Sequence, residues 1–271
     1  MRLSLQQRIF MWNYPEFDPV AISLGPVSIH WYAISYLVGI GLAWWVLGVK
    51  SRRQNLGWSN EAISDVVFYA VLGIILGGRI GYMVFYGHAQ IAADPTVLLK
   101  VWQGGMSFHG GLIGVFVALW IYGRKYRRSF FEVTDFIAPS IPLGLGCGRI
   151  GNFINGELPG RITEVPWAAI YPGEAFGRHP SSLYQAILEG PVLFAILWIF
   201  AARPRPTTAV SGLFLVGYGS LRFISELFRE PDRHMGFVAF QWLTQGQLLS
   251  IPMLLFGIAF LVTSYRATGF K

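Results

Sequence analysis

The sequence predicts an all-α polytopic membrane protein of seven transmembrane helices, with a small head outside the membrane and an N-terminal interfacial arm. Three observations support this fold class. The chain of 271 residues is 54% hydrophobic and only 13% charged, a balance that is rare in soluble domains. Its 10 Trp, 12 Tyr and 21 Phe residues suit the two interfaces of a bilayer. Apolar runs long enough to cross the hydrocarbon core recur along the chain.

The apolar runs place the seven helices in a single membrane domain that covers residues 1–271. We expect the spans over residues 27–47, 62–86, 108–123, 135–154, 183–202, 212–228 and 247–265. The third span is short, and the fourth contains Pro139 and Pro142. Because proline has no N–H group to donate within a helix, we expect the fourth span to be kinked.

Two segments outside the spans are expected to have structure of their own. Residues 155–182 form the head, a cap inserted between spans four and five, in which residues 167–171 are expected to form a short strand. At the N-terminus, Arg2 and Arg8 stand among apolar residues, and the segment is either an arm lying in the membrane interface or an ordinary ordered lead-in. We expect no cleavable signal peptide, because residues 1–26 lack a continuous apolar core. The apolar residues of the arm are Leu3, Leu5, Ile9, Phe10, Met11 and Trp12.

The basic residues indicate which ends of the spans lie in the cytoplasm. They cluster in the loops after the first, third and fifth spans and in the C-terminal tail, so the positive-inside rule predicts a cytoplasmic C-terminus and an N-terminus outside. The net charge of +7 does not indicate nucleic-acid binding, which would gather basic residues on one stripe. The clustered residues are Lys50, Arg52, Arg53, Arg124, Lys125, Arg127, Arg128, Arg203, Arg205, Arg266 and Lys271.

Glycines spaced four residues apart indicate close packing between helices inside the membrane. Cys147, the single cysteine, excludes an internal disulfide and a multi-cysteine metal site, and we expect it to be a small core residue. The histidines show no metal-ligand spacing, and we expect no metal and no cofactor. The spaced glycines are Gly73, Gly77 and Gly81 in the second span, Gly110 and Gly114 in the third, and Gly144 and Gly148 in the fourth.

The most informative stretch covers residues 148–161, at the end of the fourth span. It contains Arg149, Asn152, Asn155 and Glu157, which are costly in lipid. Polar groups at membrane depth usually face a polar cavity and mark a functional site. The sequence therefore predicts a polar pocket that opens at one face of the bilayer.

Three arginines lie inside predicted spans: Arg79, Arg149 and Arg222. Glu226 follows Arg222 by one helical turn, so these two side chains can pair along one face. For Arg79, a structural ion pair and a functional role are both open. For Arg149 and Arg222, we favour binding of a phosphate, because a guanidinium matches phosphate with paired donors.

His109 is a candidate general base, because it lies between two pairs of glycines at the start of the third span and histidine exchanges protons near neutral pH. The alternative is a satisfied structural histidine. His30 and Tyr32 are expected to line the same pocket, although Tyr32 also suits an interfacial aromatic belt. His179 lies at the entry of the fifth span, where Ser181 or Ser182 is the expected N-cap.

A base and phosphate-binding cations without a convincing nucleophile favour transfer from a phospholipid to a nucleophile on a second substrate. Two other interpretations remain open. A transporter for phospholipids or anionic solutes would use the same arginines to hold a phosphate midway across the membrane. A non-catalytic scaffold would use the polar residues to hold its helices together.

Four blocks of residues resemble the bacterial prolipoprotein diacylglyceryl transferases, in the order 104–111, 148–161, 178–184 and 218–232. The resemblance implies a multi-pass protein of the bacterial inner membrane, with seven helices, a periplasmic head and N-terminus, and a cytoplasmic C-terminus. It implies transfer of the diacylglyceryl group of phosphatidylglycerol to the lipobox cysteine thiol of a preprolipoprotein signal peptide. The products would be a thioether and glycerol 1-phosphate, and no nucleic acid would take part.

The same resemblance implies which residues act. His109, Arg149 and Arg222 would be catalytic. The chain departs from the family pattern at Ser182, at Gln185, where a carboxylate is usual, and at Pro159, where a bulky aromatic is common. With His30, which is expected from its position alone, the residues expected to bind lipid or substrate are Tyr32, Asn152, Glu157, Gly160, Tyr218, Glu226, Arg229 and His179.

Overall fold

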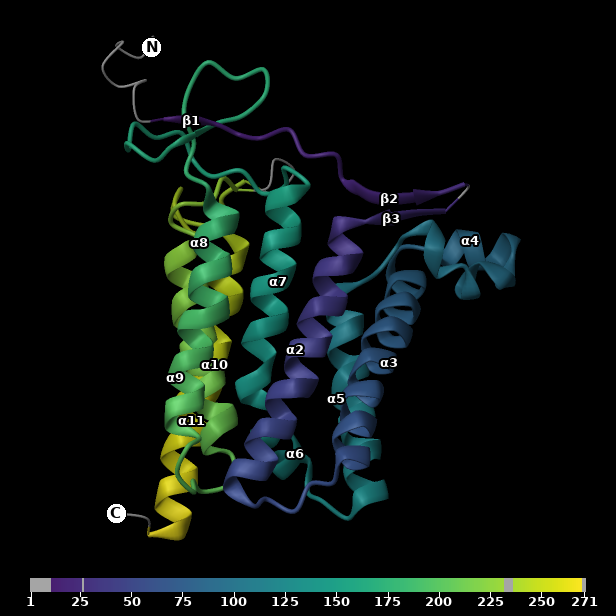
Figure 1. The fold of residues 1–271 in the computed structure, drawn as a ribbon, viewed down its shortest axis with the longest axis vertical. Helices are drawn as coiled ribbons and strands as arrows, with labels where there is room; N and C mark the ends of the chain where they lie inside the picture. The colour runs from purple at the N-terminus through teal and green to yellow at the C-terminus, as the bar shows by residue number, and fades with distance from the viewer. Residues whose placement is uncertain (1–10, 26, 232–235, 270–271) are drawn as a thin grey trace. The chain divides into compact units, whose positions relative to one another are not determined.

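The computed structural model describes residues 11–25, 27–231 and 236–269, which are mostly helical (Figure 1). The chain divides into two compact units: residues 1–43 with 137–271, and residues 44–136. Helix α2 (Trp31–Gln54) contributes its first half to one unit and its second half to the other. The predicted arm falls largely on residues 1–10, which lie outside the described residues.

The unit of residues 44–136 is built on two long helices, α3 (Asn60–Phe85) and α5 (Phe108–Tyr126), which run side by side in Figure 1. Each begins after a serine whose hydroxyl accepts a hydrogen bond from the first turn, Ser59 from the Ala62 N–H group and Ser107 from the Gly110 N–H group. The shorter elements are α4 (His88–Ala93), η1 (Pro95–Leu99), η2 (Val101–Gln103) and α6 (Phe130–Ile137).

The predicted glycine packing is confirmed between these two helices. A methyl group on Gly77 would lie 2.7 Å from the Cα atom of Gly114 and would collide with the Gly110 carbonyl oxygen. A methyl group on Gly114 would collide with the carbonyl oxygen of Gly73. The two backbones are therefore in direct contact, which residues with larger side chains would prevent.

The ion pair considered for Arg79 is wrong. Its buried guanidinium donates hydrogen bonds to backbone carbonyl oxygens of the following loop, including Leu98 at 3.3 Å and Lys100 at 3.0 Å. It also donates to the carbonyl oxygens of Val97, Gly104 and Gly105. Arg79 thus satisfies backbone carbonyls in and around the short helices η1 and η2, which is a structural role.

Among the described residues, the other unit contains the first half of α2, five further α-helices between residues 141 and 268, and four short strands. Helix α7 packs against α8 and η4, and α10 runs along α11. The helical elements are η3 (Ala138–Ser140), α7 (Ile141–Ile154), α8 (Ser181–Ile187), the π-helical turn η4 (Leu188–Val192), α9 (Leu193–Phe200), α10 (Ala209–Ser225) and α11 (Gln245–Thr268). The strands are β1 (Trp12–Asn13), β2 (Val20–Leu24), β3 (Val27–His30) and β4 (Ala169–Ile170).

Two predicted spans differ from simple helices in ways that the sequence explains. The fourth is interrupted at η3, which contains Pro139, and Pro142 lies in the first turn of α7, so the irregularity occurs where the sequence predicts a kink. The fifth is interrupted at η4, because Pro191 has no N–H group and Gly190 adopts a non-helical conformation.

The start of the first predicted span is wrong. Residues Val27–His30 form strand β3, which pairs antiparallel with β2, and the helix begins only at Trp31. The expected N-cap of the fifth span is also wrong. Pro180 precedes helix α8, and the Ser181 hydroxyl instead donates a 2.6 Å hydrogen bond to the Leu158 carbonyl oxygen.

The segment 155–182 contains the expected short strand, β4, within residues 167–171. This strand pairs in parallel with β1, so part of the N-terminal lead-in is docked on it. The ring of Tyr14 stacks on Tyr171 at 4.7 Å, and its hydroxyl donates to the Ile154 carbonyl oxygen at 3.1 Å. Burial raises the pKa of Tyr171 to about 12.

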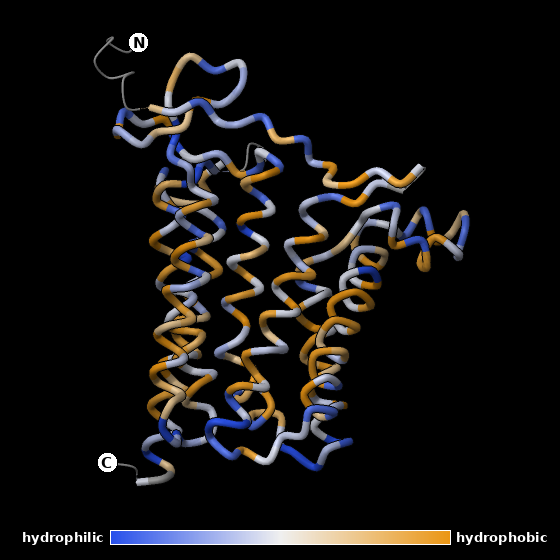
Figure 2. Tube along the Cα trace, viewed as in Figure 1, coloured by the Kyte–Doolittle hydropathy of each residue, from blue (hydrophilic) through white to orange (hydrophobic). Residues whose placement is uncertain are grey.

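The described residues include four helical segments that are long and apolar enough to cross a membrane: Trp31–Gln54, Asn60–Phe85, Ser181–Phe200 and Gln245–Ala267. Ala209–Ser225 is a shorter apolar helix. Figure 2 shows apolar (orange) stretches along these helices, and on α3 the side chains of Leu76, Ile80 and Val84 are 51%, 51% and 61% exposed. Such surfaces belong in lipid. The number of crossings and their orientation stay predictions.

Gly114→Ala tests the contact between α3 and α5. We expect the added methyl group to destabilise the protein by about 1–3 kcal/mol, because a backbone carbonyl has to move to make room. Gly41→Ala is the matched control, since a methyl group on Gly41 of α2 would meet nothing within 4 Å and alanine favours a helix. Thermal unfolding in detergent compares the two, and equal midpoints would contradict a tight helix contact.

Candidate active site

One carboxylate links the two arginines that the sequence singles out. Arg149 projects from α7, and its Nε atom lies 3.0 Å from Oε2 of Glu189 in the π-helical turn η4. Arg222 projects from α10, and its Nη1 atom lies 3.5 Å from Oε1 of the same carboxylate. Each oxygen of Glu189 therefore serves one guanidinium, which fixes the two cations close together.

The backbone around η4 explains how Glu189 reaches this position. Gly146 of α7 approaches Gly190 so closely that a methyl group on Gly146 would lie 3.0 Å from the Gly190 Cα atom. Arg149 follows Gly146 by one helical turn and so faces the same turn of η4. The close approach of the two glycines thus brings the guanidinium to the carboxylate.

The two kinds of charge differ in their exposure. The Glu189 side chain is completely buried, whereas the side chains of Arg149 and Arg222 are 19% and 14% exposed. The anion lies behind the cations, and the cations can be reached from outside. This arrangement suits binding of an external anion, because the buried carboxylate orients the guanidinium groups without covering all of their donors.

A second carboxylate extends the network. Oε1 of Glu226 lies 2.5 Å from Nη2 of Arg222 and 2.9 Å from Nη1 of Arg229, so the predicted pair of Arg222 and Glu226 is confirmed. The Thr244 hydroxyl donates to Oε2 of Glu226 at 2.9 Å. Three arginines and two glutamates leave one surplus positive charge, which favours an anionic ligand.

Tyr218 joins the same cluster. It precedes Arg222 by one turn of α10, and its hydroxyl forms a hydrogen bond with Arg149. Of the predicted site residues, the structure brings together Arg149, Tyr218, Arg222, Glu226 and Arg229.

A smaller polar group lies one turn further along α7. The Asn152 amide donates to Oε2 of Glu157 at 2.7 Å, and the Asn155 amide lies 3.2 Å from Oε1. Tyr32 of α2 forms a hydrogen bond with Asn152, and its hydroxyl lies 3.0 Å from that of Tyr36. Glu157 is therefore held by two amides.

Gly160 and His179 shape the loops beside the cluster. The Gly160 N–H group donates to the His179 carbonyl oxygen at 3.1 Å, and Gly160 forms an antiparallel bridge with Arg229. A methyl group on Gly160 would collide with that carbonyl and lie 2.8 Å from the Phe228 carbonyl oxygen. Burial lowers the pKa of His179, whose Nδ1 atom lies 3.2 Å from the Tyr184 hydroxyl.

Two predicted histidines lie on other elements than the arginines. His109 belongs to the unit of residues 44–136, where it is exposed on the first turn of α5 and its ring lies 5.6 Å from that of Phe108. His30 is exposed at the end of strand β3, opposite Val20 of β2, and not within a helix as predicted.

Glu189 was not among the predicted site residues, although the sequence contains a signal for it. Glu189 lies in the predicted span 183–202, where the rule that selected the arginines selects it as well. Gln185, at the position where the family usually has a carboxylate, and Ser182 are also fully buried on α8. Among the described residues, neither Gln185 amide atom nor the Ser182 hydroxyl has a hydrogen-bond partner.

The sulfur of Cys147 is not part of the network, and the residue is half-buried on α7. Within residues 11–25, 27–231 and 236–269, no three His, Cys, Asp or Glu side chains converge to form a metal site.

Comparison with known proteins shows one consistent family. The model of the prolipoprotein diacylglyceryl transferase family matches residues 19–263. A protein of Chromohalobacter salexigens named phosphatidylglycerol–prolipoprotein diacylglyceryl transferase is 57% identical over 257 residues, which cover 94% of this chain and 96% of the relative. Proteins with the same name from Ectopseudomonas mendocina and Legionella pneumophila are each 55% identical, over 94% and 92% of this chain and 97% of each relative.

Glu189→Gln tests the central carboxylate. We expect this change to destabilise the protein by about 3–5 kcal/mol, because two partly buried guanidinium groups lose their shared counter-charge. Asp94→Asn is the control, since it breaks a more exposed pair with Lys100, and exposed pairs contribute little to stability. Thermal unfolding in detergent measures both, and equal stability of Glu189→Gln and the parent would show that the arginines do not depend on this carboxylate.

Proposed function

The chain belongs to the prolipoprotein diacylglyceryl transferase family, and from this premise we propose how its residues carry out the transfer. The protein is a membrane-embedded transferase that moves a diacylglyceryl group from phosphatidylglycerol to prolipoprotein. In our proposal the acceptor is the thiol of the lipobox cysteine in the signal peptide. The products are a thioether and glycerol 1-phosphate.

The main support for this proposal is the exposure of Arg149 and Arg222, the two arginines that Glu189 links. Arg149 and Arg222 are held by a buried carboxylate and remain accessible, so their remaining donors are available to a phosphodiester. The phosphodiester is a monoanion, and the cluster has one surplus positive charge. The headgroup of phosphatidylglycerol therefore matches the cluster in charge and in hydrogen-bonding groups.

The chemical step is a displacement at carbon. The thiol loses its proton to His109, since the thiolate is the effective nucleophile. Its sulfur attacks the glyceryl carbon bonded to the phosphate oxygen, so a C–S bond forms while the C–O bond breaks. The departing glycerol 1-phosphate keeps the oxygen and gains negative charge, which Arg149 and Arg222 stabilise. The proton on His109 then passes to the phosphate or to water.

The remaining site residues would bind and orient. Tyr218 would orient Arg149, and Glu226 with Arg229 would orient Arg222. Asn152, Glu157 and Tyr32 would bind hydroxyl groups of the headgroup, since they offer both donors and acceptors. The residues assigned to shaping the substrate entrance are His30, Gly160 and His179.

We place the protein in the bacterial inner membrane as a multi-pass protein with the site at the periplasmic face. The basic loops support this orientation, because they follow α2, α5 and α9 and would lie in the cytoplasm. The N-terminus would then be periplasmic and the C-terminus cytoplasmic.

One assay separates this reaction from the transporter and the scaffold. Purified protein, labelled phosphatidylglycerol and a lipobox peptide are incubated together, and the peptide is analysed by mass spectrometry. A transferase adds the mass of a diacylglyceryl group to the peptide cysteine. Movement of lipid without a change in peptide mass would support a transporter, and neither result would support a scaffold.

Arg149→Lys and Arg222→Lys test the paired donors. We expect each to lower the transfer rate about ten- to hundredfold, because lysine keeps the charge but loses a charge-assisted hydrogen bond to the phosphate. Arg53→Lys, at an exposed position near the end of α2, is the control and should keep the parent rate. Full activity of both lysine variants would remove the proposed role of the arginines.

His109→Gln tests the general base. We expect the rate to fall by about 10² to 10⁴-fold, and the pH dependence due to this group to disappear, because glutamine cannot accept the proton. His88→Gln, at an exposed position on α4 of the same unit, should leave the pH profile unchanged. Parent rates at every pH in His109→Gln would assign the base to another group.

A further inference from the structure

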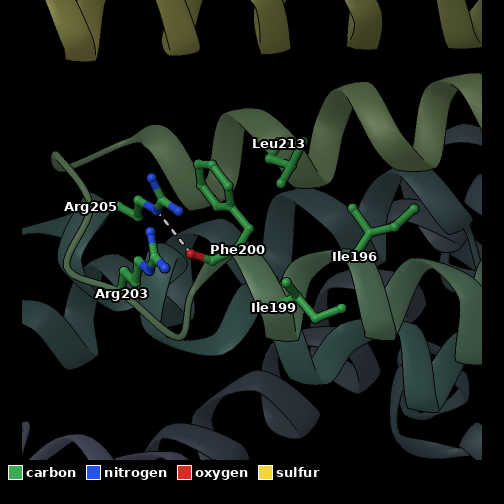
Figure 3. Close-up of a pocket in the computed structure, with 6 residues that line it drawn as sticks. All are labelled: Ile196, Ile199, Phe200, Arg203, Arg205 and Leu213. Carbon is green, nitrogen blue, oxygen red and sulfur yellow. Dashed lines mark hydrogen bonds between the residues drawn. The ribbon is translucent and has the colours of Figure 1, made fainter. Parts of the chain in front are cut away.

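A pocket of about 490 Å³ lies between the end of α9 and the first turns of α10. Its six lining residues are drawn in Figure 3: Ile196, Ile199, Phe200, Arg203, Arg205 and Leu213. It lies at the opposite end of α10 from Arg222. The helix rises about 20 Å between its first residue, Ala209, and Arg222, so the pocket is separate from the arginine cluster.

The pocket has a charged end and an apolar end. Figure 3 shows Arg203 and Arg205 together on the loop after α9, whereas Ile196, Ile199 and Leu213 lie along the two helices. Ile196 and Ile199 are 41% and 72% exposed. Cations beside an exposed apolar wall match an amphiphile that carries a negative charge at one end.

The two arginines differ in how they are held. The Arg205 Nε atom donates to the Phe200 carbonyl oxygen at 2.9 Å, its guanidinium lies 4.1 Å from the centre of the Phe200 ring, and its Nη1 atom lies 3.4 Å from the Tyr265 hydroxyl. These contacts orient the guanidinium of Arg205 and leave further donors on it. Arg203 is exposed beside it. One fixed and one adaptable cation can therefore bind the same anion.

We propose that this pocket binds an anionic phospholipid. Its phosphate lies between Arg203 and Arg205, and one acyl chain lies along Ile196, Ile199 and Leu213. Basic pockets between membrane helices bind anionic headgroups in this way. A soluble phosphate would gain nothing from the apolar wall, and a zwitterionic headgroup would bring its own cation toward two arginines.

Native mass spectrometry of the detergent-purified full chain tests this site, with phosphatidic acid as the probe. We expect Arg203→Gln to lower retention of phosphatidic acid about fivefold, the effect of one arginine near a charged headgroup. Ile199→Ser should also lower retention of phosphatidic acid, because it removes apolar surface that would contact the acyl chain. Arg53→Gln is the matched control, because Arg53 is another exposed arginine after a predicted span, and it should retain lipid as the parent does.

Three further measurements identify the kind of molecule that the pocket binds. Phosphatidylcholine should be retained less than phosphatidic acid, and glycerol 3-phosphate should not be retained. In an Arg149→Lys background, Arg203→Gln should lower retention of phosphatidic acid by the same factor as in the parent. This result would distinguish the pocket from the arginine cluster. Equal losses in Arg203→Gln and Arg53→Gln, equal retention of the two lipids, or retention of glycerol 3-phosphate would each overturn the proposal.

Discussion

The bond network of the site depends on the buried carboxylate of Glu189. Two guanidinium groups on different helices repel each other at short range, and this repulsion is strong where water is scarce. Glu189 accepts one arginine on each oxygen and removes the repulsion. Helix α7 and helix α10 are thereby linked through η4.

The backbone is irregular where this carboxylate lies, and the irregularity has a physical reason. A regular helix through residues 188–192 would place Pro191 where an N–H group is needed. The π-helical turn avoids that conflict and lets Gly190 contact Gly146 of α7. Turns of this kind occur often at functional sites because they redirect a side chain without ending the helix.

Much of the fold could be predicted from the sequence because hydropathy and glycine spacing are local signals. They indicated the apolar helices and close packing at the spaced glycines, which the structure shows between α3 and α5. The irregularity near Pro139 and Pro142 and the pair of Arg222 with Glu226 were also predictable, from the missing N–H group of proline and from helical spacing. The misassigned residues depend on contacts with distant segments. Arg79 binds backbone carbonyls, His30 lies on a strand, and Ser181 donates a hydrogen bond to Leu158. The sequence around each of these residues does not indicate its partner.

The site was predictable in part for the same reason. Arg149 and Arg222 stood out as charges within apolar spans, and Glu189 satisfied the same criterion but was overlooked. That Tyr218 reaches Arg149, and that Thr244 reaches Glu226, depends on how α7, α10 and α11 pack. The roles of the site residues in transfer, including His109, stay proposals.

The enclosure of both carboxylates has a consequence for how turnover is organised. Glu189 and Glu226 are each engaged by two arginines, and protonating either one would break contacts that keep the cations in place. Neither carboxylate can therefore accept and release a proton without weakening the ion pairs that hold the arginines in place. In the proposed reaction, the arginines would stay permanently charged beside the departing phosphate, and a group other than these two carboxylates would accept the proton.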